Sequence, residues 1–492
     1  MNQTVIADDA APREEHAVEP LYANRVKVHP KDVRGRFRRL KWAALGLLLG
    51  IYYILPWVRW DRGPNAPDQA VLIDMVNRRT WFFFIELWPQ EVYYFTGLLV
   101  LAALGLFLVT SLAGRVWCGY ACPQTVWTDL FQWVERRIEG DRNARIKLDA
   151  EPFGWRKARK RLTKHAIWLV IAAVTGGAWI MYFNDAPTVV REIFTGQASL
   201  TVYGFVALFA ATTYLLAGWA REQVCTYMCP WPRFQAAMFD EDTLVVTYQR
   251  HRGEPRGKLR KGPIQDGAPL GDCVACNQCV AVCPTGIDIR DGIQLECIGC
   301  ALCVDACDAV MDKIGKPRGL IGYDTERNRL NRAAGRPTEY RLFRPRTAIY
   351  GTLLAIVGVF MLWGLTTRPS LGLNILHDRS PLFVTLANGD IRNGYTVKIL
   401  NMSRSARTFS LDVDGLAGAT VTVGGTAGED RPVLTADADS VATHQVFVRV
   451  PRAAVSEEVV PITFRVSEAG RVAEAGGGET AVHETVFRGP KP

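Results

Sequence analysis

Residues 271–311 read GDCVACNQCVAVCPTGIDIRDGIQLECIGCALCVDACDAVM, and this stretch decides how the middle of the chain folds. It holds two runs of four cysteines with the spacing C-x2-C-x2-C-x3-C. The first run is Cys273, Cys276, Cys279 and Cys283, and the second is Cys297, Cys300, Cys303 and Cys307. Three thiolates two residues apart let one loop wrap three corners of a cubane, as in bacterial ferredoxins with two [4Fe–4S] clusters. The duplicated run therefore predicts two such clusters.

The fourth cysteine of each run is expected to serve the other cluster, as it does in those ferredoxins. One cluster then takes Cys273, Cys276, Cys279 and Cys307, and the other takes Cys297, Cys300, Cys303 and Cys283. This crossing ties the two halves together and brings the clusters close enough for electron hopping. A pair of zinc sites is disfavoured, because zinc motifs usually pair two C-x2-C units across a longer loop.

Four more cysteines follow apolar stretches of the chain. Cys118 and Cys122 lie in WCGYACP, and Cys225 and Cys229 lie in CTYMCP. On a helix, C-x3-C puts both sulfurs on one face, which suits a shared metal. Four soft thiolates predict a site for Cu(I), zinc or a further iron–sulfur centre, or redox dithiols. The alternative is that these cysteines pack helices and that the prolines after them end those helices.

Five stretches without charged residues are long enough to cross a hydrocarbon core of about 30 Å, which takes about 17–25 residues. They lie within residues 42–58, 92–114, 166–184, 193–220 and 347–367. A sixth stretch, residues 80–90, is too short and contains Glu86. We expect it to be interfacial or re-entrant, with Trp81 and Trp88 at headgroup depth.

The distribution of charge orients these spans. The net charge is +9, but the part from residue 377 onward has 12 Lys and Arg against 14 Asp and Glu. The excess of positive charge therefore lies beside the apolar stretches, which indicates membrane orientation rather than a nucleic-acid partner. Residues 115–165 alone hold a dozen Lys and Arg. The positive-inside rule thus predicts a cytoplasmic N-terminus, with a retained first span rather than a cleaved signal peptide.

All twelve cysteines lie between Cys118 and Cys307, so this topology places them on the cytoplasmic side, where reduced thiolates are expected. In chain order, the sequence predicts a cytoplasmic segment (1–41), spans one to four (42–220) with a cytoplasmic loop (115–165), and a cytoplasmic ferredoxin-type domain (221–346). Span five (347–367) and an outer domain (368–492) follow.

The outer domain shows the alternation of apolar and polar residues that is typical of strands. The predicted inward residues fall in four sets. They are Tyr395, Val397 and Ile399; Phe409, Leu411 and Val413; Val446, Val448 and Val450; and Ile462, Phe464 and Val466. Turn residues separate these sets. About seven short strands in roughly 110 residues favour an all-β, immunoglobulin-like sandwich.

Three long blocks of the sequence resemble the FixG/RdxA/CcoG family of cytochrome c oxidase accessory proteins. They are VWCGYACPQTVWTDLFQWVERRIEG (116–140), REQVCTYMCPWPRFQAAMFDEDTLVVTYQRHRGEPRG (221–257) and the cysteine repeat. The likeness runs from about residue 30 through the sandwich. It carries over the eight ferredoxin cysteines as cluster ligands. The C-x3-C-P pairs carry over as Cys118, Cys122, Cys225 and Cys229 without an assigned role, so a redox or copper site there is predicted from their chemistry alone.

The resemblance implies a protein of the bacterial inner membrane that helps to assemble a cbb3-type cytochrome c oxidase. Its activity would be reduction of Cu(II) to Cu(I) for the copper centre of the oxidase. A cytoplasmic or quinol donor would supply the electrons, and copper would be the substrate. The expected partners are the lipid bilayer and oxidase assembly factors or copper-transport proteins, with the sandwich domain outside docking one of them.

Two other functions stay open on the sequence. One is a quinol–ferredoxin electron relay without copper chemistry, and the other is an assembly scaffold whose clusters are structural or sensing. Glu86 and Glu91 are candidates for a quinol or metal-entry site, against ordinary interfacial carboxylates. Met181 and Met228 are candidate soft copper ligands, against packing side chains. The sequence has no glycine-rich motif for a nucleotide or dinucleotide.

Overall fold

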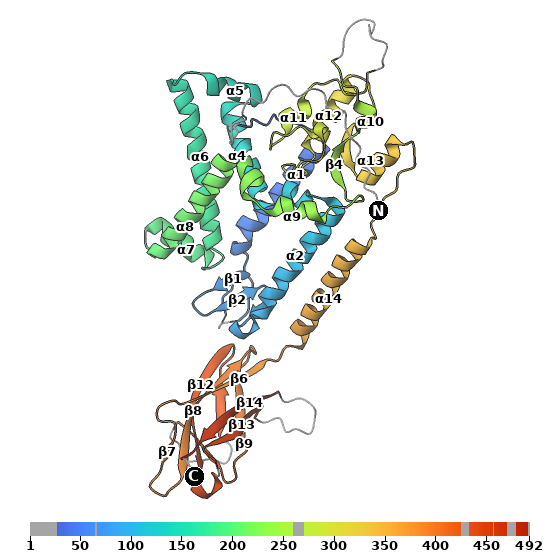
Figure 1. The fold of residues 1–492 in the computed structure, drawn as a ribbon. Helices are drawn as coiled ribbons and strands as arrows, with labels where there is room; N and C mark the ends of the chain where they lie inside the picture. The colour runs from blue at the N-terminus through green and yellow to red at the C-terminus, as the bar shows by residue number, and fades with distance from the viewer. Residues whose placement is uncertain are drawn as a thin grey trace, which may run out of the picture. The chain divides into compact units, whose positions relative to one another are not determined.

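The computed structural model describes residues 27–63, 66–258, 270–424, 432–455, 457–469 and 479–490 (Figure 1). The chain forms two compact units, each built from separate segments. The first unit runs up to residue 51 and adds residues 105–177 and 200–350. The second unit comprises residues 52–104, 178–199 and 351 onward. All twelve cysteines belong to the first unit.

Five helical stretches of the described chain are long and apolar enough to cross a membrane, as predicted. They are α1 (Arg36–Ile54) with η1 (Leu55–Trp57), η2 (Pro89–Glu91) with α2 (Tyr93–Ala113), α6 (Trp155–Ile180), α8 (Leu200–Thr213) with the π-helix η3 (Tyr214–Ala220), and α14 (Pro345–Thr367). The predicted bounds of the second and fifth spans lie within three residues of the observed ones.

Two of these helices begin earlier than the sequence predicted. Helix α1 begins at Arg36 instead of residue 42, and α6 begins at Trp155 instead of residue 166. The basic residues before the apolar stretches are helical because carboxylates of α4 (Pro123–Glu139) neutralise them. The Nη1 of Arg38 lies 2.9 Å from Oδ2 of Asp129, and both side chains are buried. A charged residue marks the end of an apolar stretch in the sequence. The helix itself can continue through that residue when an opposite charge pairs with it.

The fourth span is shorter than the predicted segment. Residues 193–195 belong to α7 (Ala186–Thr195), which ends at Gly196 in the left-handed conformation, with φ of 74°. Glycine adopts this conformation without steric cost, so it stops α7 before α8 begins.

Residues 80–90 form a β-hairpin instead of a re-entrant segment. Strands β1 (Val71–Asp74), β2 (Arg79–Phe82) and β3 (Ile85–Leu87) make an antiparallel sheet. Trp81 and Trp88 are each 3 % exposed, so they pack within their own unit and do not form an exposed aromatic belt.

The segment between spans four and five folds around the cysteine repeat. Helix α9 (Trp231–Met238) leads to β4 (Val245–Tyr248), which pairs antiparallel with β5 (Ile321–Asp324). Two helices, α11 (Gln278–Val282) and α12 (Leu302–Lys313), carry the ends of the two cysteine runs. Shorter elements complete the unit: α3 (Val116–Tyr120), α5 (Arg142–Ala150), η4 (Val224–Met228), α10 (Arg250–Gly253), η5 (Ile289–Asp291) and α13 (Glu326–Ala333).

The C-terminal part is a sandwich of two antiparallel sheets (Figure 1, orange to red). The first sheet has the order β10-β12-β8-β6 with β7 beside β8, and the second has the order β11-β9-β13-β14. The strands are β6 (Leu371–His377), β7 (Val384–Thr385), β8 (Ile391–Asn401), β9 (Arg407–Asp414), β10 (Thr420–Val423), β11 (Val433–Ala436), β12 (Ser440–Val450), β13 (Val459–Glu468) and β14 (Thr480–Arg488). The described residues after β14 form no further helix or strand.

The predicted inward residues of this sandwich form its core. Eleven of the twelve are at most 2 % exposed, and Val413 is half-buried against them. The described part of the sandwich contains nine strands, where the sequence predicted about seven. Short strands such as β7 have too few residues to show an alternating pattern, so the sequence does not reveal them.

Candidate functional site

The two cysteine runs fold as a structural repeat. In each run the residue after the second cysteine, Asn277 or Ala301, has a left-handed backbone with φ of 54° or 56°. That residue is the N-cap of α11 in the first run and of α12 in the second. Residues other than glycine rarely adopt this conformation, which costs roughly 1 kcal/mol or more. The duplicated sequence therefore gives two equivalent loops that bend sharply around their thiols.

The structure places the fourth cysteine of each run among the thiols of the other run. The pKa of Cys307 is raised to about 12, mainly by burial and next by the thiol of Cys279, with smaller contributions from Cys276 and Cys273. Burial also raises the pKa of Cys297 to about 12, with additional contributions from Cys300 and Cys283. The crossed ligand assignment requires the fourth cysteine of each run to lie near the thiols of the other run. We propose that assignment on the basis of this proximity.

The chemistry of these donor sets fits an iron–sulfur cluster. Buried thiols with raised pKa values are stable as thiolates only when a metal compensates their charge. Among the described residues, no group of three or more His, Cys, Asp or Glu side chains could hold a single metal ion. That observation concerns one ion, whereas the ligands of a cubane stand at its separate corners.

Two side chains near the first ligand set carry no signal in the sequence. Arg290 and Tyr248 lie beside the thiol of Cys273. The hydrogen bond to Asp288 is the main cause that raises the pKa of Arg290, burial is the main cause that raises that of Tyr248, and Cys273 adds to both. The guanidinium of Arg290 is held by Asp288, with its Nε 2.8 Å from Oδ1. Hydrogen bonds to cluster sulfurs and nearby charge tune reduction potentials, so these side chains belong to the site.

The four remaining cysteines do not share helix faces in the predicted way. Cys118 lies in α3, but Cys122 is in an extended conformation just before α4. Likewise, Cys225 lies in η4 and Cys229 is extended just after it. The prediction of two C-x3-C pairs on helix faces is therefore wrong. The cause is the following proline, which excludes the residue before it from the helical region and starts a new helix.

The tertiary structure nevertheless brings these four cysteines together as a quartet. The pKa of Cys118 is raised to about 12, mainly by burial. The thiols of Cys122 and Cys225 contribute next, and that of Cys229 contributes least. Burial also raises the pKa of Cys225 to about 12, followed by effects of Cys122 and Cys229. The thiol of Cys118 donates to Oε1 of buried Gln235 at 3.3 Å. We use the name quartet for Cys118, Cys122, Cys225 and Cys229.

Helix α3 connects the quartet to the second cysteine run by direct contact. A Cβ at Gly119 would lie 3.0 Å from the Cα of Cys300, closer than most real Cβ contacts, so glycine favours this close approach. The hydroxyl of Tyr120 donates to the carbonyl of Cys300 at 3.0 Å. Cys118 and Cys225 both pack against the apolar cluster that contains Cys300. The quartet and the second ligand set are therefore adjacent in one packed unit.

A buried arginine lies between the two thiol sets. Arg115 is 5 % exposed, and burial lowers its pKa while the thiols of Cys297 and Cys118 raise it. Its Nη1 donates to the carbonyls of Gln294 at 2.7 Å and Cys297 at 3.2 Å. Sequence reasoning did not single out Arg115, because a basic residue after an apolar span is explained by the positive-inside rule alone.

The weaker candidates have structural contacts of their own. Glu91 accepts a hydrogen bond from the backbone N–H of Trp88 at 3.0 Å and closes the first turn of η2. Glu86 lies 3.1 Å from Nη1 of Arg79. Both carboxylates belong to the second unit, whereas the quartet belongs to the first. Met228 lies in η4 beside the quartet, and it is 62 % exposed.

Comparisons with protein families match three regions of the chain. A "4Fe-4S dicluster domain" covers residues 220–326, and a "4Fe-4S binding domain" covers residues 95–140. An "IG-like fold at C-terminal of FixG" covers residues 361–490. All twelve cysteines lie within the two 4Fe–4S matches. These matches confirm the predicted iron–sulfur domain and the immunoglobulin-like sandwich.

Curated relatives match nearly the whole chain. The nitrogen fixation protein FixG of Rhizobium meliloti is 53% identical over 89% of this chain and 89% of its own length. Protein RdxB of Cereibacter sphaeroides is 50% identical over 95% of this chain and 97% of its own length. Protein RdxA of the same organism is 48% identical over 96% and 99%.

Proposed function

This chain belongs to the FixG/RdxA family of membrane iron–sulfur redox proteins, and on that basis we propose that it reduces Cu(II) to Cu(I) for assembly of a cbb3-type cytochrome c oxidase. The observation that supports this proposal most is the contact made by α3. It places the quartet, a set of soft ligands, directly against a loop that carries predicted cluster ligands.

The chemistry requires one electron for each copper ion. When bound, the two [4Fe–4S] clusters supply one-electron transfer, which is the stoichiometry of reducing Cu(II) to Cu(I). The eight cysteines of the two runs would hold them. The quartet would take the copper ion, because soft thiolates favour Cu(I) over harder ions. In the described part of the chain its four thiols are not arranged as a single-ion site, so copper binding would require them to move closer together. The Cu(I) product would then pass to a copper-transport protein or an oxidase assembly factor.

Several side chains of this chain would position the quartet for that task. Gln235 accepts from the thiol of Cys118 and donates from Nε2 to the hydroxyl of Thr110 at 3.4 Å. The hydroxyl of Thr125 donates to the carbonyl of Cys118 at 2.6 Å. These contacts fix the turn between α3 and α4, so the thiols of Cys118 and Cys122 keep a defined separation.

The proposed topology places the iron–sulfur domain in the cytoplasm and the sandwich outside the inner membrane, where it would dock a partner. We expect a reporter fused after Arg256 to be active only in the cytoplasm, and one fused at Gly415 only outside. The physical reason is the dozen basic residues in 115–165, which resist transfer across the membrane. A cytoplasmic signal at Gly415 would show that the chain crosses the membrane an even number of times.

Cupric reduction is tested directly with purified protein under anaerobic conditions. After reduction with dithionite and removal of the excess, the protein should convert added Cu(II) to Cu(I), detected with a Cu(I)-specific chelator. Protein reduced by a quinol but inert toward Cu(II) would favour the electron relay instead. Protein inert toward both would favour the scaffold.

A further inference from the structure

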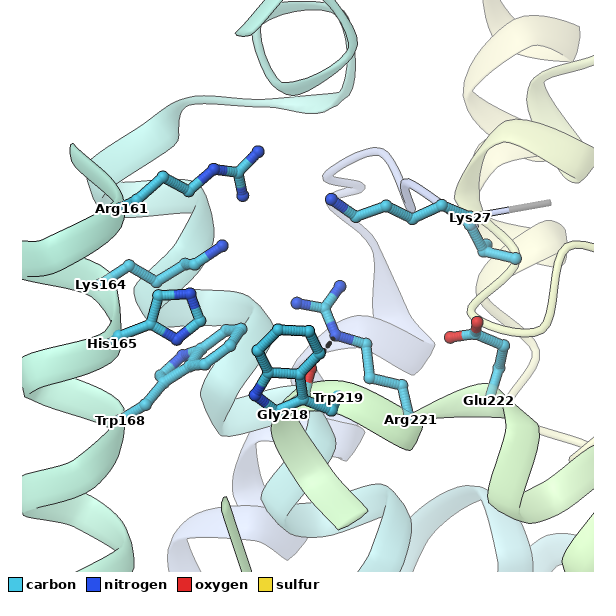
Figure 2. Close-up of a pocket in the computed structure, with 10 residues that line it drawn as sticks. Lys27, Arg161, Lys164, His165, Trp168, Gly218, Trp219, Arg221 and Glu222 are labelled. Carbon is cyan, nitrogen blue, oxygen red and sulfur yellow. Dashed lines mark hydrogen bonds between the residues drawn. The ribbon is translucent and has the colours of Figure 1, made fainter. Parts of the chain in front are cut away.

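A cavity of about 430 Å³ lies in the first unit, outside the cysteine sites (Figure 2). It is lined by the N-terminal part of α6, by the end of η3 with the turn after it, and by residues 27 and 28. The lining includes four cationic side chains and one carboxylate. They are Lys27, Arg161, Lys164 and Arg221, with Glu222 as the carboxylate.

The charged ends of the four cations converge on one open space. Figure 2 shows Arg161 and Lys164 reaching from α6 toward the cavity, with Lys27 directed at them from the opposite side. The guanidinium of Arg221 points into the same space from below. Like charges repel, so four cations approach one space only where carboxylates or a bound anion offset their charge.

Carboxylates pair with each of these cations, and Asp149 bridges Lys27 and Arg161. The ammonium of Lys164 lies 2.8 Å from Glu139, and that of Lys27 lies 2.8 Å from Asp149. Arg161 pairs with both of these carboxylates. Buried Glu135 receives Arg221 at 3.0 Å and also pairs with Arg145 behind it. The cations are thus held in place, and their remaining donors face the cavity.

Arg221 provides an independent indication of a ligand. Its side chain is 6 % exposed, with Nε bonded to the carbonyl of Gly218 at 2.8 Å and Nη2 to Glu135. Its Nη1 is buried and has no hydrogen-bond partner among the described residues. A buried guanidinium nitrogen without an acceptor is costly, so an anionic ligand that draws the head of Arg221 into the cavity and accepts from Nη1 would be favoured.

The wall beside the cations is aromatic and rigid. The ring of Trp168 is 2 % exposed, with the ammonium of Lys164 4.8 Å from its centre and the guanidinium of Arg221 at 5.3 Å. His165 is fixed by a 2.9 Å hydrogen bond to the hydroxyl of Tyr214 and stacks on Trp219. Tryptophan beside basic residues at the end of a membrane helix is typical of the headgroup region.

From these observations we infer that the cavity binds a phosphate group, supplied by the headgroup of an anionic phospholipid. A phosphate has several acceptor oxygens, which match the converging donors and the unpaired Nη1 of Arg221. Trp219, 56 % exposed, borders the cavity where the acyl chains would leave it for the bilayer. The bound lipid would link α6 to Arg221 and Glu222, which follow η3. Glu222 lies three residues before Cys225 of the quartet.

The test measures lipid binding by the full-length protein in detergent, using thermal shift and native mass spectrometry. Phosphatidylglycerol should raise the melting temperature and stay bound, and phosphatidylcholine should do neither. Replacement of Arg161 or Lys27 by glutamine should weaken binding at least about tenfold, because each removes one charge-assisted contact. In Arg161→Gln, Glu139 keeps Lys164 as its partner, so the fold should survive.

Arg156→Gln is the matched control. It removes the same charge from the same helix, but the side chain of Arg156 is 70 % exposed and does not line the cavity. Its affinity should change by less than about twofold. If inorganic phosphate binds as tightly as the lipid, the lipid source is wrong and the site takes soluble phosphate. Equal loss in Arg156→Gln and Arg161→Gln, or a shift produced by quinones and not by phosphates, would overturn the assignment.

Discussion

Replacing Cys283 with serine should destroy the cluster of the second run and leave the cluster of the first run intact. Anaerobically purified wild-type protein should contain about eight iron and eight sulfide atoms in these two clusters, and the variant about half as much. The reason is spatial: the thiol of Cys283 acts electrostatically on Cys297, Cys300 and Cys303, although Cys283 belongs to the other run. A serine oxygen is a harder and poorer ligand for cluster iron than a thiolate.

The measurement is EPR of the dithionite-reduced protein together with iron and sulfide analysis. Wild type should show two interacting [4Fe–4S]⁺ centres, and Cys283→Ser should show one isolated centre. The matched control is Cys307→Ser, which should remove the other centre, because Cys307 lies among Cys273, Cys276 and Cys279. If each variant instead damages the centre of its own run, the ligands are not crossed.

Single serine substitutions at Cys118, Cys122, Cys225 or Cys229 should each lower cupric reduction by more than about 100-fold. Loss of an outer-shell partner typically costs about 10–100-fold, and loss of a ligand should exceed that. The four effects should be alike, because a four-thiolate site loses its geometry with any one ligand. The eight cysteines of the two runs are untouched, so their two EPR centres should remain.

Met228→Leu is the control for this series. Met228 lies between Cys225 and Cys229, but its side chain is 62 % exposed, so the activity of this variant should be close to that of wild type. Cells with a quartet variant should assemble little active oxidase, and added copper should restore part of it. Iron in excess of about eight atoms, lost in the quartet variants, would assign a further iron–sulfur centre to the quartet.

The packing alternative predicts a different outcome for the same four variants. Serine is close in volume to cysteine but adds a hydroxyl, so a packing role would cost about 1–3 kcal/mol of stability at the three partly buried positions and would leave cupric reduction intact. Normal cupric reduction in all four variants would therefore leave the quartet as structure. Melting temperatures measured in parallel separate loss of activity from loss of the fold.

Local patterns in the sequence were sufficient for the features that depend on neighbouring residues. The spacing of the cysteine runs predicted the [4Fe–4S] domain, because a loop that wraps a cubane needs its thiols at fixed short intervals. The apolar stretches predicted five spans, since the length of a span is set by the thickness of the bilayer. The alternation at residues such as Tyr395 and Val397 predicted the core of the sandwich, because side chains of a strand alternate between its faces.

The tertiary structure decided the features that depend on residues far apart in the chain. Helix α1 begins at Arg36 because Asp305, far along the chain, accepts hydrogen bonds from the backbone N–H groups of Phe37 and Arg38 in its first turn, and Asp129 pairs with the side chain of Arg38. The quartet is adjacent to the second run because Gly119 allows the backbone of α3 to meet Cys300. Arg221 lines a cavity whose other cations lie on α6 and at residue 27. No local pattern encodes such contacts, because they arise only when helices pack and bury charges and thiols against one another.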